Sequence, residues 1–249
     1  MEIIGRGMIA RSLAPYRDLH RDSIAFATGV SASSAADPEN CRREEALLSE
    51  TLERARSRGR RIVYFSGGGA VYGAVERPAD ERVDCRPVSP YGHHQLACER
   101  RVAESGVPFV IARLPNVVGS PANPNQLVPT LVNAVISGRV VVQRAAIRDL
   151  IDSADVARLL SELLAAEHDR LTINVATGHA VDTSVIVDEI CSILRVEVRR
   201  EDGGQGEDQT LAVGLLHEVL GRDPFPDPFE YRNVLARHVP LLATTSALG

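Results

Sequence analysis

The sequence contains no lysine, because all 28 of its basic residues are arginine. Its 249 residues also include no tryptophan, and aromatic residues make up only 4%. The missing lysine excludes every mechanism that needs a lysine amine. The remaining composition, with 44% apolar and 24% charged residues, is that of a globular protein with a full core.

Cysteine is also scarce, at four residues: Cys41, Cys85, Cys98 and Cys191. They are widely spaced and form no C-x-x-C pair, and we expect no local cluster with histidine. This spacing predicts reduced, structural thiols and no metal site.

The sequence also has no excess of basic charge and no long apolar run. The net charge of −5 argues against nucleic-acid binding. No run approaches the ~18 apolar residues of a membrane helix, and residues 1–5 lack the basic and apolar regions of a signal peptide. We therefore expect a cytoplasmic protein, free of membrane and nucleic acid, with a small-molecule substrate.

What is present is an alternation of apolar strands and amphipathic helices, which predicts an α/β fold with a doubly wound parallel sheet. The expected strands are residues 2–4, 23–28, 61–65, 107–112 and 171–175, with an extended segment at 140–143. The expected helices are residues 8–16, 37–58, 89–105, 127–138, 153–167 and 183–194. The polar, glycine-rich stretch 201–210 predicts a mobile loop.

The first strand runs into Gly5-Arg6-Gly7-Met8-Ile9-Ala10, a G-x-G-x-x-A pattern that opens a helix. Glycines at these positions let the backbone approach an anion, and the helix N–H groups face it. The pattern therefore predicts phosphate binding at Gly5 and Gly7.

Several motifs follow in a fixed order: S-G-G-G-A-V-Y-G from Ser66, P-Y-G-H-H-Q from Pro90, A-R-L-P-N-V-V-G from Ala112, R-D-L-I-D-S-A-D-V-A from Arg148 and I-N-V-A-T-G from Ile173. Over residues 1 to about 195 this series resembles the extended short-chain dehydrogenase/reductase family of nucleotide-sugar epimerases, dehydratases and reductases. The resemblance implies a Rossmann-like core (residues 1–116 and about 148–176) and a small C-terminal substrate-binding cap (about 117–147 and 177–249). It also implies an NADP or NAD cofactor and a homodimer formed by helix 37–58 and the helix after Tyr91.

The sequence departs from the family pattern at the catalytic tyrosine. The family's Y-x-x-x-K pairs a tyrosine acid/base with a lysine, but here Tyr91 is followed by Gln95. An unperturbed tyrosine titrates near ~10, so Tyr91 needs a substitute cation to act as a base. His94, which lies on the same helical face, and His93 are the candidates for this cation. The alternative for each is that it is simply a solvent-exposed residue in the helix turn.

A second departure lies at Gly68, which stands where the family has a catalytic serine or threonine. Ser66 is two residues earlier and would point elsewhere. The glycines either bring backbone N–H groups close to a substrate or form a flexible loop left after catalysis was lost.

The third departure is a deletion, since only residues 17–22 separate the first helix from the strand that corresponds to the family's fourth. The second and third strand units, which carry the ribose-binding acid, are therefore expected to be missing. Arg6 and Arg11 are possible phosphate partners. If a dinucleotide binds, these features favour NADP.

The resemblance assigns the remaining contacts residue by residue. Ala10, Thr28, Gln95 and Pro115 would join Gly5, Arg6 and Gly7 in cofactor binding. Asn116 and Arg148 would hold substrate phosphate. The structural alternatives are that the Asn116 amide caps a loop and that Arg148 forms a surface ion pair.

Three functions remain open at this point. The first is an NAD(P)H-dependent reductase or epimerase acting on a nucleotide-linked or natural-product sugar, with Tyr91 as the proton donor. The second is a cofactor-independent isomerase, cyclase or lyase on the same scaffold, centred on Tyr91, His93 or His94. The third is a non-catalytic binding subunit.

Overall fold

Five parallel strands form the central sheet of the computed structural model, which describes residues 1–29, 37–166 and 168–246. In order across the sheet they are β1 (Glu2–Ile4), β2 (Ser23–Phe26), β3 (Arg61–Gly67), β4 (Phe109–Leu114) and β9 (Arg170–Asn174). Each neighbouring pair is parallel. The expected α/β fold is confirmed, and β1 pairs directly with β2, so the sheet is shortened as the deletion predicts.

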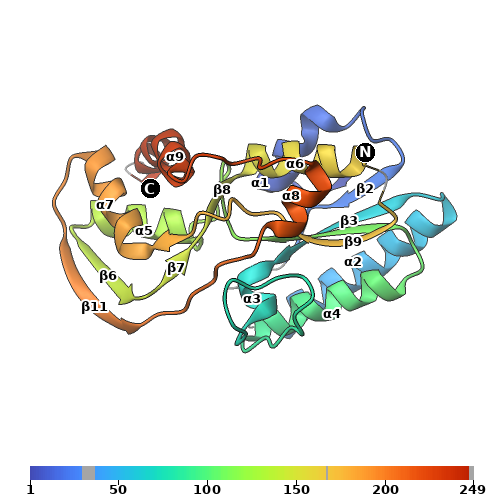
Figure 1. Ribbon diagram of the computed structural model, residues 1–249, viewed down its shortest axis with the longest axis horizontal. Helices are drawn as coiled ribbons and strands as arrows, with labels where there is room; N and C mark the ends of the chain where they lie inside the picture. The colour runs from blue at the N-terminus through green and yellow to red at the C-terminus, as the bar shows by residue number, and fades with distance from the viewer. Residues whose placement is uncertain (30–36, 167, 247–249) are drawn as a thin grey trace.

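Helices cover both faces of this sheet (Figure 1). One face carries α1 (Met8–Leu13), which continues as the 3-10 turn Ala14–Tyr16, and α6 (Ser153–Ala165). The other carries α2 (Pro38–Ser57) and α4 (Pro90–Glu104).

Consecutive strand residues supply the two halves of the core. Ala25, Val63 and Val110 pack with the leucines of α6, whereas their neighbours Ile24, Ile62 and Ile111 pack with α2 and α4. Successive side chains of a strand point to opposite faces, and a covered parallel sheet is apolar on both. This is why the strands read as unbroken apolar runs.

A second group of helices and short strands gathers around a separate apolar cluster, on the left in Figure 1. Its helices are α5 (Leu127–Ile136), α7 (Thr183–Leu194) and α9 (Glu230–Ser246). Its short strands pair as β6 (Arg139–Arg144) with β11 (Arg199–Gln205), β7 (Ile147–Arg148) with β10 (Val181–Asp182), and β5 (Asn116–Val118) with β8 (Leu150–Asp152).

The C-terminal part of the chain also contributes to the core of the sheet. Leu216, on α8 (Gly214–Leu220), and Phe225 belong to the same apolar cluster as the α6 leucines. The chain crosses several times between the apolar cluster of the sheet and the second apolar cluster. The division into core and cap therefore stays a prediction from the resemblance.

One expectation about local structure was wrong. The stretch 201–210 is not all loop, because Arg199–Gln205 forms β11, which pairs with β6 along its backbone, and Glu201 accepts a hydrogen bond from Arg139 of β6 at 2.5 Å. Of the two alternatives left open for the glycines after β3, the flexible loop is excluded, because residues 68–72 form a short helix, α3 (Gly68–Tyr72). Within the described residues, no helix has the length and apolar character needed to cross a membrane.

Asp152 joins the two apolar clusters. It caps α6 by accepting from the Ala154 N–H at 2.8 Å, and it pairs with Arg237 and His238 of α9. Burial alone would raise the pKa of this carboxyl, but the bonds from His238, Ala154 and Arg237 outweigh burial and lower the pKa.

We expect Asp152→Asn to lower the free energy of unfolding at pH 7 by about 1–3 kcal/mol, the range for a hydrogen bond to a charged group. Because the folded-state pKa is depressed, the carboxylate stabilises the fold above its unfolded pKa, and this contribution is lost as the pH falls through the folded value. The difference between the two proteins should therefore shrink below about pH 4, as measured by urea unfolding.

Asp18→Asn is the matched control, since Asp18 is exposed and forms its ion pair with the equally exposed Arg21. It should change stability by less than about 0.5 kcal/mol. A pH-independent loss in Asp152→Asn would contradict the electrostatic explanation.

Candidate active site

A pocket of about 560 Å³ opens at the carboxyl ends of β1, β3 and β4. This is the edge at which open parallel sheets bind ligands. The residues that line it are Met8, Ile9, Phe65, Ser66, Gly67, Gly69, Ala70, Gly73, Val88, Ser89, Tyr91, Leu114, Pro115, Asn116, Val117, Val118, Asn123, Asn125, Gln126, Leu127, Val128, Glu207 and Gln209.

Tyr91 lines this pocket from the first turn of α4. Ser89 caps that helix by accepting from the Gly92 N–H at 3.0 Å, and Pro90 occupies its first position. The Tyr91 side chain lies against Gly67, where an added Cβ would be 3.2 Å from the hydroxyl oxygen. Burial, and then the charge of Glu44, raise the pKa of Tyr91 to about 12, so at neutral pH the phenol keeps its proton.

The neighbouring candidates on α4 point elsewhere. His94 is buried against α2, with its Nε2 3.0 Å from Glu44 Oε2 and its Nδ1 3.5 Å from Glu45 Oε1. His93 is exposed, Gln95 is buried, and neither lines the pocket. Of the residues predicted on this helix, only Tyr91 therefore reaches the pocket.

Gly68 and Gly69 are covered by a segment far along the sequence. A Cβ built on Gly68 would lie 2.8 Å from Leu211 Cδ1, and one on Gly69 would lie 2.9 Å from the carboxamide carbon of Gln209. Leu211 is fully buried. Leu211 therefore fills the space beside Gly68 that a side chain at this position would need.

Residues 207–211 form this covering segment, and backbone hydrogen bonds hold it on both sides. Ile147 N donates to Glu207 O, Gln209 N donates to Ile147 O, and Ala79 N donates to Thr210 O, each at 3.1 Å. Glu207 and Gln209 consequently line the pocket. Sequence reasoning missed both, because their polar, glycine-rich surroundings are typical of a loop.

Arg148 serves this same segment. Its Nη1 donates to the carbonyl oxygens of Ile147 and Glu207, at 2.8 and 2.5 Å. Burial lowers the pKa of the guanidinium. Arg148 does not line the pocket, whereas Pro115 and Asn116 do, and Asn116 Nδ2 donates to Asp149 O at 3.3 Å.

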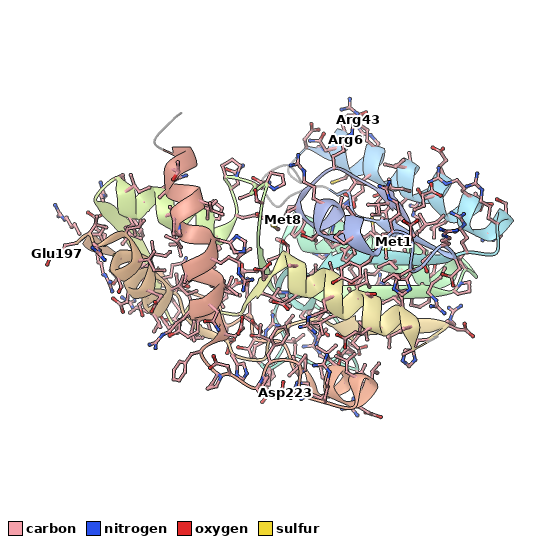
Figure 2. All side chains as sticks on the ribbon, turned by 90° about the horizontal axis from the view of Figure 1, so that it is seen from above. Met1, Arg6, Met8, Arg43, Glu197 and Asp223 are labelled. Carbon is pink, nitrogen blue, oxygen red and sulfur yellow. The ribbon has the colours of Figure 1, made fainter. Side chains whose placement is uncertain are left out.

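The glycine turn lies beside the pocket, after β1. Gly5 has φ +128°, and a Cβ there would be 2.2 Å from Ala27 O, so packing alone requires this glycine. A Cβ on Gly7 would meet no heavy atom within 4 Å, and this leaves open space for a ligand. Figure 2 shows Met8 toward the middle of the molecule and Arg6 on its outer surface.

The other predicted cofactor contacts differ in exposure. Ala10 is buried in α1, and Thr28 is exposed after β2. The open space at Gly7 therefore has room for a pyrophosphate. The strand units that would flank an adenosine are missing from the sheet, where β1 pairs directly with β2.

A buried ion pair lies beneath the pocket. Arg113 of β4 donates to Glu99 of α4 through Nη2 at 2.7 Å and Nε at 3.1 Å. Its guanidinium stacks on the Tyr72 ring, 4.7 Å from the centroid, and the Tyr72 hydroxyl donates to Asn174 Oδ1 at 2.9 Å. One network therefore joins α4, β4, α3 and the end of β9.

A second buried cluster joins α2 and α4: Glu44, His94 and Cys98. Burial, and then the charge of Glu44, raise the pKa of the Cys98 thiol to about 12. The sequence predicted no metal site, although His94 and Cys98 are four residues apart and so share one helical face. The i, i+4 spacing of His94 and Cys98 was the one sign of this cluster in the sequence. Glu44 lies 50 residues before His94, so sequence spacing does not connect it with the other two.

Replacing Gly68 tests the packing of Leu211. We expect Gly68→Ala to lower the free energy of unfolding by about 1–3 kcal/mol, because the added methyl group overpacks the buried Leu211. Leu211→Ala should be less costly in the Gly68→Ala background than in the wild type, and urea unfolding of the four proteins measures this coupling.

Gly214→Ala is the control, since an added Cβ there meets nothing within 4 Å. Strict additivity of Gly68→Ala and Leu211→Ala would contradict the proposed contact.

Comparison with known proteins places this geometry among related folds. The model of the NAD dependent epimerase/dehydratase family matches residues 22–176. A search of curated protein sequences gave no match.

Several solved structures share the fold. MoeE5 in complex with UDP-glucuronic acid and NAD is 23% identical, with a TM-score of 0.76 over 97% of this chain and 85% of that one. RMD from Pseudomonas aeruginosa, complexed with NADPH, is 20% identical, with a TM-score of 0.74 over 90% and 82%. The UDP-glucose 4-epimerase of Thermotoga maritima with UDP-glucose is 20% identical, with a TM-score of 0.74 over 96% and 82%.

Proposed function

Because the chain belongs to the NAD-dependent epimerase/dehydratase family, we propose that it is an NAD(P)H-dependent reductase that acts on a keto group of a sugar. The sugar is carried by a nucleotide or by a natural product. Of the two reactions that the sequence left open, reduction is favoured over epimerisation by the state of Tyr91.

The observation that carries this proposal is a protonated tyrosine in the pocket. With a pKa of about 12, Tyr91 holds its proton at neutral pH. A bound nicotinamide would supply hydride for the carbonyl carbon, and Tyr91 would donate its proton to the carbonyl oxygen. An epimerase must first remove a proton from a hydroxyl group, which requires the tyrosinate that the missing lysine would have stabilised.

The cofactor is proposed to lie across the ends of β1 and β4. Gly5 and Gly7 would hold its pyrophosphate with Arg6, and Pro115 would contact the nicotinamide. Ala10, Thr28 and Gln95 complete the set implied by the resemblance. Arg6 and Arg11, together with the missing ribose-binding acid, favour NADPH.

The sugar is proposed to occupy the side of the pocket formed by residues 116–128 and 207–209. Its polar groups there are mainly carboxamides, which donate and accept hydrogen bonds as hydroxyl groups do. Among the described residues that line the pocket, none has a basic side chain. Asn116 remains the proposed phosphate contact, and Arg148 would act from behind Glu207.

Cofactor-independent chemistry is the second candidate. It is favoured by Gly68, where Leu211 takes the place of a hydroxyl, and by Gln95 in place of lysine. Tyr91 would then be the acid of an isomerisation or elimination. A non-catalytic binding subunit is the third, and binding without turnover would identify it.

Calorimetric titration with NADPH and NADH is the first test. We expect micromolar binding, tighter for NADPH, followed by reduction of at least one keto sugar from a panel. Tyr91→Phe should keep this affinity and lower kcat by about 10²–10⁴, the usual contribution of a positioned proton donor.

Tyr16→Phe is the matched control, because Tyr16 lies in the 3-10 turn away from the pocket. If neither dinucleotide binds, the redox proposal fails and the cofactor-independent candidate takes its place. If Tyr91→Phe retains full activity, Tyr91 is not the donor.

We also propose a homodimer formed by the outer faces of α2 and α4. Leu47 of α2 is a large apolar side chain that is 38% exposed. Leu47→Glu should weaken association in sedimentation equilibrium, whereas Leu19→Glu, which changes an exposed leucine outside these helices, should not. A wild-type monomer at micromolar concentration would contradict the proposal.

A further inference from the structure

We propose that Glu44, His94 and Cys98 form a binding site for one zinc ion between α2 and α4. This site is separate from the pocket and does not depend on the proposed reaction. The argument begins with ligand type, because carboxylate oxygen, imidazole nitrogen and thiolate sulfur are the three donors that zinc takes in proteins.

The distances between these donors are close to those around a zinc ion. His94 Nε2 lies 3.0 Å from Glu44 Oε2 and 3.8 Å from Cys98 Sγ, and all three atoms lie within 4.8 Å of one another. Around a tetrahedral ion, bond lengths of about 2.0–2.3 Å place neighbouring donors roughly 3.3–3.6 Å apart. Shifts of a fraction of an ångström to about 1 Å would therefore admit the ion.

The helices fix the donors before any ion arrives. His94 and Cys98 are one turn apart on α4, and Glu44 reaches them from α2. The exposed fractions of the His94 and Glu44 side chains are 5% and 4%, and Cys98 is fully buried. Such burial limits alternative side-chain positions and keeps competing water away.

Outer contacts orient the histidine. Glu45 Oε1 faces His94 Nδ1 at 3.5 Å, and Arg101 Nη2 holds Glu45 Oε2 at 3.4 Å. A carboxylate behind a metal-binding histidine fixes the ring and makes its other nitrogen a better ligand. Here that arrangement leaves Nε2 directed at Glu44 and Cys98.

An independent observation comes from the sheet side of the cluster. Tyr64 of β3 is 1% exposed and belongs to the same apolar cluster as Cys98, and its hydroxyl interacts with the Cys98 thiol. Three ligand donors with this hydroxyl beside them form a polar centre inside an apolar layer, as a bound cation requires.

Coordination would replace two protons, one from the Cys98 thiol and one from the His94–Glu44 contact, because zinc binds the deprotonated forms. No electron transfer is involved.

The test uses the full chain, produced in zinc-supplemented medium and analysed for metal by mass spectrometry. We expect one zinc per chain in the wild type. Protein produced with cobalt instead should show the near-ultraviolet sulfur-to-cobalt charge-transfer band and the visible bands of a tetrahedral site.

Cys98→Ser and His94→Gln should lose the metal and the charge-transfer band. Cys191→Ser and His93→Gln, at sites outside the cluster, should retain both. Glu45→Gln should keep the band but weaken zinc binding about 10- to 100-fold, as loss of an outer ligand contact does. Circular dichroism establishes that each variant is folded.

The wild type decides the question even if a variant does not fold. A folded wild-type chain without stoichiometric zinc, and with no sulfur-to-cobalt band after production with cobalt, would overturn the proposal. Retention of the band in folded Cys98→Ser would also overturn it. Because every readout is metal content or a spectrum, failure here is distinct from failure of the cofactor titration.

Discussion

The buried ion pair between Arg113 and Glu99 is the interaction on which the pocket depends. It joins β4 to α4 beneath the pocket, and stacking on Tyr72 extends it to α3 and β9. Removing one partner of such a pair leaves a buried charge, at a cost of about 3–5 kcal/mol. The strand that delivers Pro115 and Asn116 and the helix that delivers Tyr91 are thus held at one spacing, and the pocket lies between their ends.

The covering segment, residues 207–211, is the second feature that shapes the pocket, because Glu207 and Gln209 line it. Leu211 fills the space beside Gly68, and Gln209 lies against Gly69. Glycine at both positions and the covering segment are therefore one arrangement, since a larger residue at 68 would displace Leu211. Arg148 belongs to it as well, because its guanidinium holds the carbonyl of Glu207. Arg148 and Gly68 therefore both support a wall of the pocket.

The sequence predicted what depends on local pattern. Apolar runs such as residues 62–65 predicted the parallel strands, and the short connection at residues 17–22 predicted the shortened sheet. What failed depends on contacts between distant residues. β11 is polar and is held by pairing with β6, and Glu207 and Gln209 reach the pocket only because residues 146–148 and 79 hold their segment. Helical spacing placed His94 on the face of Tyr91, but only the position of α2 shows that Glu44 and Glu45 engage it.

Burial makes the tyrosinate form of Tyr91 costly to reach and keeps the phenol in the protonated form, which can donate a proton. Ionising a phenol of pKa about 12 at pH 7 costs roughly 7 kcal/mol, at 1.36 kcal/mol per unit. A reaction that begins with proton removal bears that cost, whereas one in which negative charge develops on a carbonyl oxygen begins from the form already present. A chain without lysine has no ammonium group with which to lower this cost, and the guanidiniums of Arg113 and Arg148 are committed to Glu99 and to backbone carbonyls. This difference is the physical reason for proposing proton donation by Tyr91, and hence reduction, as the reaction of this pocket.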